Sequence, residues 1–118
     1  MMFLRVLNGG KMNVVNLTPH PIVVRGIGDE KVYEPSGIVP RLIVKEEPDG
    51  AIKNIPVVKR GFAGVENMPA HIEGTIYIVS SMLLSALSER TDVVAPDTGK
   101  TCIRDEKGRI VAVTRFCR

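Results

Sequence analysis

The sequence predicts a small β-rich α+β domain, and three observations support this fold class. Val and Ile supply 27 of the 118 residues, and β-branched side chains favour strands. Short apolar runs alternate with clusters of Gly, Pro, Asn and Asp, which mark turns. A single segment combines the apolar spacing of a helix with a capping residue before it. We therefore expect about eight short strands and one helix.

The length of 118 residues and the formal net charge of +3 fit one globular domain. We place this domain at residues 12–118 and interpret residues 1–11 as an N-terminal extension. A turn-type segment, Asn8-Gly9-Gly10-Lys11, directly precedes Met12. The alternative is that residues 3–7 form an edge strand of the domain.

The first half of the chain is strand-like throughout. Glu47-Pro48-Asp49-Gly50 is a strong turn signal, so residues 38–60 are predicted to form a hairpin that turns there. Pro40, near the start of that hairpin, favours an edge strand. Further strands are expected at residues 13–17, 22–25 and 31–34, and an irregular loop at residues 61–74.

The second half contains the predicted helix between two apolar strands. Residues 75–79 form an apolar run typical of a strand buried on both faces. Ser80 or Ser81 can cap a helix over residues 82–89, with Leu83 and Leu87 on its buried side. Another strand follows at residues 92–95. If the two strands are parallel, the helix is the crossover between them.

The C-terminal region predicts a hairpin of residues 101–105 and 110–116. Its register places Cys102 opposite Val113 and several residues from Cys117, so we expect two free thiols. Free thiols are typical of a reducing compartment, and no apolar run is long enough for a membrane span. The sequence therefore predicts a cytoplasmic protein without a membrane segment.

Four short motifs lie in the chain from Met12 onward: Asn16-Leu17-Thr18-Pro19-His20, Ser36-Gly37 with Arg41, Arg90-Thr91-Asp92 and Pro96-Asp97-Thr98-Gly99. In these motifs the chain resembles a set of small proteins from phages, prophages and some bacteria and archaea, which typically begin close to an "NLTPH" motif. The resemblance extends over most of the chain from Met12 onward. It implies a mobile-element gene context and no particular activity.

The predicted binding site lies where the two apolar strands end. Parallel pairing would bring Ser80 and Ser81 to the same sheet edge as Asp97-Thr98-Gly99-Lys100, and ligands favour that carboxyl edge. Lys100 and the helix start would face a phosphate, while Asp97 could accept from a ribose hydroxyl. His20 or Arg41 is expected nearby, and Arg41 could join Arg104 and Arg115 in binding phosphate. The alternative is a capped helix and an Asp-Gly turn with no ligand.

The function expected from these residues is a non-catalytic binding protein for an anionic small molecule, such as a nucleotide, or for a host protein. We expect no metal, because His20, His71, Cys102 and Cys117 lack zinc-type spacing. No cofactor is expected either, because Gly99-Lys100-Thr101 has Val94 where a phosphate-binding loop needs Gly.

Two other functions are kept as alternatives. One is a small hydrolase that uses His20 with Asp92 or Asp97. The other is a nucleic-acid-binding module, which the small net charge and the few aromatic residues make a poor fit. Exposed strand edges also favour a homodimer.

Overall fold

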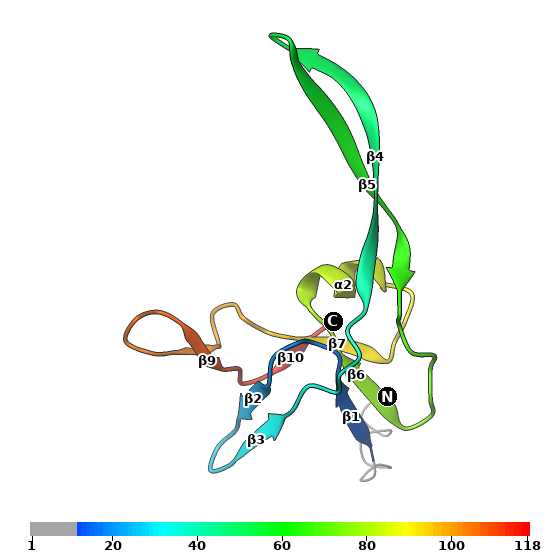
Figure 1. Ribbon diagram of the computed structural model, residues 1–118. Helices are drawn as coiled ribbons and strands as arrows, with labels where there is room; N and C mark the ends of the chain where they lie inside the picture. Colours follow the sequence, from blue (N-terminus) through cyan, green and yellow to red (C-terminus); the bar gives the residue numbers. More distant parts are fainter. Residues whose placement is uncertain (1–11) are drawn as a thin grey trace.

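The computed structural model describes residues 12–118, and it confirms a β-rich α+β domain built from several small sheets and one short helix (Figure 1). The proposed extension, residues 1–11, lies outside the described residues. Among residues 12–118, no helix has the length and apolarity to cross a bilayer. In chain order the elements are β1 (Asn13–Asn16), β2 (Ile22–Arg25), β3 (Glu30–Tyr33), β4 (Arg41–Ile52), β5 (Ile55–Glu66), β6 (Thr75–Ile78), α2 (Ser81–Ala86), β7 (Val93–Pro96), β8 (Ile103–Arg104), β9 (Ile110–Ala112) and β10 (Phe116–Cys117).

A four-stranded sheet in the order β1-β6-β7-β10 forms the centre of the body. β1 pairs with β6 in parallel, β6 pairs with β7 in parallel, and β10 closes the sheet antiparallel to β7. The sequence left open whether these two strands are parallel; in the structure the β6–β7 pair is parallel, with α2 as its crossover. Tyr77, Ile78 and Val79 are all buried, as expected for a strand covered on both faces.

The core lies between this sheet and α2. Leu17, just after β1, and Val93 in β7 are each 1% exposed, and Leu83 of the helix packs with them. Leu42 and Val65, at the base of the β4–β5 hairpin, contact the edge of the same cluster. The core therefore holds the base of that hairpin, while the rest of it extends beyond the body (Figure 1).

The helix is shorter than the sequence predicts. The side chain of Ser80 caps it by accepting a hydrogen bond from the backbone N–H of Leu83, as expected. The helix ends at Ala86, and Leu87 forms the C-cap and is half-buried, although the sequence predicted full burial. The early end follows from local geometry, because Leu87 has left the helical region with φ −110° and ψ 30°.

We expect Leu83→Ala to lower the free energy of unfolding by about 2–5 kcal/mol, the usual cost of a cavity at a buried leucine. Leu87→Ala should cost less, because part of that side chain already contacts solvent. Met82, which is 65% exposed, provides the control, and Met82→Ala should change stability by no more than about 0.5 kcal/mol. Urea denaturation of the three variants gives this ranking, and equal losses at all three positions would contradict the observed helix phase.

The predicted β4–β5 hairpin is present, but its turn is not where the sequence placed it. The tip is Lys53-Asn54, where both residues have positive φ (49° and 67°), as a type I′ hairpin turn requires. The predicted turn at Pro48-Asp49-Gly50 is instead a bulge within β4. β5 then runs on to Glu66, so the first residues of the predicted 61–74 loop are strand. A two-residue I′ turn matches the twist of the strands, which explains why it displaces the stronger local signal.

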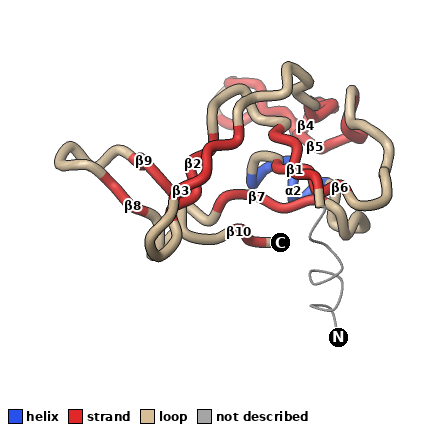
Figure 2. The backbone as a smooth tube through the Cα atoms, turned by 90° about the horizontal axis from the view of Figure 1, so that it is seen from below, coloured by secondary structure: helices blue, strands red, loops and turns tan. Residues whose placement is uncertain are grey.

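Two smaller hairpins pack beside each other on the other side of the body (Figure 2). β2 and β3 correspond to the strands expected at residues 22–25 and 31–34, and they pair antiparallel with each other. β8 pairs with β9 only briefly, and the chain then leaves to form β10 against β7, so the predicted hairpin of 101–105 with 110–116 is too long. Val113 connects the two hairpins through its backbone. Its N–H donates to the carbonyl of Val23 at 2.9 Å, and its carbonyl accepts from the backbone N–H of Arg25 at 2.8 Å.

Candidate functional site

The residues after β6 and β7 reach the same edge of the sheet, which is the condition on which the predicted binding site depends. The N–H of Val79 donates to the carbonyl of Val94 at 2.8 Å, so the two strands stay paired up to that edge. Ser80 and Ser81 leave β6 there, and Asp97-Thr98-Gly99-Lys100 leaves β7 there. The parallel topology therefore brings the two predicted segments to a common edge.

Several polar groups of this edge already have partners within the chain. The hydroxyl of Ser80 caps the helix, and the helix has only six residues. Asp97 accepts from Gly99 N–H at 2.9 Å and from Arg115 Nε at 2.6 Å. These two interactions, the backbone one first, lower the pKa of Asp97. Ser81, Thr98, Gly99 and Lys100 are exposed, and Lys100 forms no side-chain ion pair with the described residues.

His20 and Arg41 are not joined to this edge by any hydrogen bond or ion pair among residues 12–118. Both side chains are exposed. Arg104 donates to the carbonyl of Gly108 at 2.7 Å, and Arg115 pairs with Asp97. The sequence suggested Arg41, Arg104 and Arg115 as joint phosphate ligands. No hydrogen bond or ion pair among residues 12–118 links these three side chains to one another.

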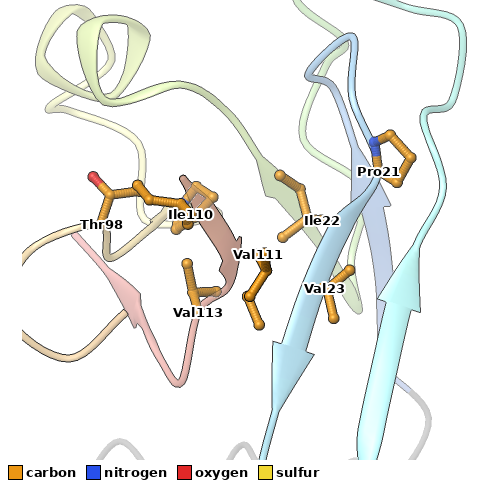
Figure 3. Close-up of a pocket in the computed structure, with 9 residues that line it drawn as sticks. Pro21, Ile22, Val23, Thr98, Ile110, Val111 and Val113 are labelled. Atoms are coloured by element: carbon orange, nitrogen blue, oxygen red, sulfur yellow. The ribbon is translucent and has the colours of Figure 1, made fainter. Parts of the chain in front are cut away.

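A groove of about 240 Å³ separates the end of β7 from the β2 and β9 hairpins (Figure 3). Ile22, Val23, Val111 and Val113 converge on it, and Thr98 supplies the one side-chain hydroxyl in its lining. Pro21, next to His20, lines the same groove. The loop that holds His20 and the turn after β7 therefore border one hollow, and its apolar lining suits a hydrocarbon side chain better than a phosphate.

The Asn16-Leu17-Thr18-Pro19-His20 segment is a hydrogen-bonded structural unit. Asn16 is 2% exposed, and its Nδ2 donates to the carbonyls of His20 and Tyr33, both at 2.8 Å. Its Oδ1 accepts from the N–H of Thr18 at 2.8 Å and from the hydroxyl of Thr18 at 2.7 Å. The side chain thereby joins the end of β1, the following turn and β3.

A second polar cluster surrounds Asp92, directly before β7. Its carboxylate is 5% exposed and accepts from Arg90 Nε at 2.9 Å and Arg90 Nη2 at 2.7 Å. Nδ1 of His71 lies 3.1 Å from the same carboxylate. The Arg90 hydrogen bond, with a further contribution from His71, lowers the pKa of Asp92 from 3.8 to about 2. The guanidinium also donates to the carbonyl of Pro69 at 2.9 Å and lies 5.9 Å from the ring centroid of Tyr77.

Sequence reasoning did not predict the His71–Asp92 contact. The two residues are 21 positions apart in no recognisable motif, so no local signal could have revealed it. The proposed hydrolase pair is not assembled among the described residues, because Asp92 interacts with Arg90 and His71, and Asp97 with Arg115. Within residues 12–118, no three His, Cys, Asp or Glu side chains are grouped to hold a metal, and Cys102 and Cys117 are free thiols.

The β4–β5 hairpin, here called the ribbon, exposes several large apolar side chains. Cross-strand partners share a face and successive residues alternate between faces. Three successive pairs on one face are Val44 with Phe62, Glu46 with Arg60, and Pro48 with Val58. We call these six residues the apolar ribbon face. The opposite face carries Lys45 with Gly61 and Glu47 with Lys59.

The apolar ribbon face is open to solvent. Val44 is 48% exposed, Val58 49% and Phe62 62%. The charged pair between them is formed, since Arg60 Nε lies 2.8 Å from Glu46 Oε2. Neither strand has a sheet partner other than its mate among the described residues. A two-stranded hairpin by itself is marginally stable in water, and this hairpin leaves an apolar face exposed.

No protein-family model, curated protein or solved structure matches this chain.

Proposed function

We propose that this chain is a small non-catalytic binding protein whose ligand is another protein, and that it binds this partner through the ribbon. The observation that carries the proposal is the apolar ribbon face, which projects from the body with Phe62 62% exposed (Figure 1). A solvated apolar face of this kind is typical of surfaces that bind proteins. The groove beside Thr98, with its apolar lining, is a second place where a protein side chain could bind.

The charge of the ribbon favours a protein over a nucleic acid. Residues 41–66 contain five Lys or Arg and four Asp or Glu. A nucleic-acid-binding arm needs an excess of basic residues that neutralise phosphates. The anionic small molecule is supported less well, because Asp97 is held by Arg115 and the helix start is already capped by Ser80.

Further parts of the proposal concern context. The free Cys102 and Cys117 fit a reducing, cytoplasmic compartment. The resemblance of the Asn16–His20 segment to phage and prophage proteins supports a gene carried by a mobile element. The long unpaired edges of β4 and β5 favour a homodimer.

A photo-activated cross-linking residue at position 62 tests the proposal in cells that express the gene. We expect covalent adducts of discrete protein mass from Phe62, because that side chain would lie in the interface. The same residue at position 72 is the control, since Ile72 is 58% exposed but lies outside the ribbon, and it should give no such adducts.

A thermal-shift assay with inorganic phosphate and nucleotides tests the competing function. We expect no increase in the melting temperature with any of these ligands. A concentration-dependent increase that Lys100→Ala abolishes, together with no adducts at position 62, would replace the proposed protein partner with an anion.

A further inference from the structure

The apolar ribbon face has a pattern that matches itself. Its central pair is charged, with Glu46 on β4 and Arg60 on β5, and an apolar pair lies two residues away on each side along the strands. The two sides are the Val44–Phe62 pair toward the body and the Pro48–Val58 pair toward the tip. Each pair contributes one side chain from each strand. Exchanging the two strands therefore leaves every pair at the same position along the ribbon.

A twofold axis parallel to the strands performs that exchange between two copies. Rotation by a half-turn about such an axis stacks β4 of one ribbon on β5 of the other, face to face. Glu46 then lies opposite Arg60 of the partner subunit, and Val44 lies opposite Phe62 of the partner subunit. Stacked sheets lie about 10 Å apart, which lets side chains of the two faces interdigitate. Both the charges and the apolar side chains are therefore complementary in this arrangement.

We propose that the apolar ribbon face binds the same face of a second copy of this chain about a twofold axis along the ribbon. The inference rests on the proposed function, because it assumes that the ribbon is the binding element, and it identifies the partner as an identical subunit. A closed twofold dimer uses one self-complementary patch on both subunits, and the Glu46–Arg60 pair meets that requirement. The near balance of charge over residues 41–66 also removes any strong repulsion between two ribbons.

Charge reversal tests the interface directly. In Glu46→Arg two arginines would face two arginines across the twofold, and in Arg60→Glu glutamate would face glutamate. We expect each variant to weaken the dimer at least about tenfold, since like charges in an interface are costly. Mixing the two variants should restore dimers, because each arginine of one ribbon then faces a glutamate of the other. Light scattering and sedimentation equilibrium measure both results.

Glu47→Lys is the matched control. It places two lysines across the strands, as Glu46→Arg places two arginines, but on the opposite face. It should leave the dimer intact. Circular dichroism and melting temperature should show equal folding of Glu46→Arg and Glu47→Lys, which separates interface effects from ribbon stability.

Three results would overturn the inference: a monomeric wild-type protein at the highest soluble concentration, equal dissociation by Glu47→Lys and Glu46→Arg, or no heterodimer on mixing. The cross-linking result tests the proposed function independently of the dimer. Adducts at position 62 to a different protein, with a monomeric wild type, would refute the twofold dimer and uphold the ribbon as a binding element.

Discussion

Replacing Asn16 by leucine is expected to lower the free energy of unfolding by about 3 kcal/mol or more, because buried polar groups lose their partners at a cost of about 1–3 kcal/mol each. Asn16 is 2% exposed, and its amide nitrogen satisfies the carbonyls of His20 and Tyr33. Leucine keeps the branched skeleton of the side chain and leaves no cavity, so the loss would come mainly from hydrogen bonding. Urea denaturation followed by circular dichroism measures the change.

Thr18→Val is the control for this result. It removes one hydroxyl, which donates to Asn16 Oδ1 at 2.7 Å. It leaves intact the hydrogen bonds from Asn16 Nδ2 to the carbonyls of His20 and Tyr33. The expected loss is about 1 kcal/mol, the net value of a typical hydrogen bond. The expectation is wrong if Asn16→Leu lowers the free energy of unfolding by no more than Thr18→Val does. In that case the hydrogen bonds of Asn16 would not be what joins β1 to β3.

The second large effect is expected at Arg90. Arg90→Ala should lower the free energy of unfolding by about 3 kcal/mol, because removing one partner leaves a buried carboxylate without compensation. The carboxylate of Asp92 is 5% exposed, and the guanidinium also ties Pro69 to the sheet. Arg25→Ala is the control, since Arg25 and Glu30 form an exposed pair at 2.9 Å, and such pairs contribute no more than about 1 kcal/mol.

The same pair determines part of the response to acid. The pKa of Asp92 is lower in the folded state, about 2 against 3.8, so its contribution to stability is complete above pH 4 and is lost as the pH falls from 4 to 2. In Arg90→Ala the folded-state pKa moves back upward, so less stability is lost in that window. Denaturation at pH 6, 4 and 2 checks the sign. An equal acid-dependent loss in wild type and Arg90→Ala would show that other carboxylates dominate.

Local patterns in the sequence were sufficient for most of the elements. The apolar run over residues 75–79, the capping serine and the apolar residues after the helix predicted the strand–helix–strand order of β6, α2 and β7, but left open whether the two strands are parallel. The register of the last hairpin, which kept Cys102 away from Cys117, also followed from the turn residues. These features depend on neighbours close in the chain, where side-chain periodicity and turn chemistry act.

The ribbon shows where local signals compete. Pro48-Asp49-Gly50 is the stronger turn motif, yet the chain turns at Lys53-Asn54 and absorbs the motif as a bulge. The choice depends on pairing over the full length of both strands, because moving the turn changes which residues lie opposite one another. The one-sided pattern of the apolar ribbon face, with Glu46 beside Arg60, appears only once that register is known.

The sequence alone predicted a β-rich α+β fold with one helix between two apolar strands, and an edge where Ser80 and Asp97 converge if those strands are parallel; the structure supplied the parallel pairing. The tertiary structure decided which side chains are paired with one another and which are exposed. It joined Asp97 to Arg115 across 18 residues and Asp92 to His71 across 21, and it left Phe62 exposed on a projecting ribbon. The physical reason is that burial and pairing between distant residues depend on how the strands are packed and on their register. The residues that lie next to one another in the sequence do not reveal either of these.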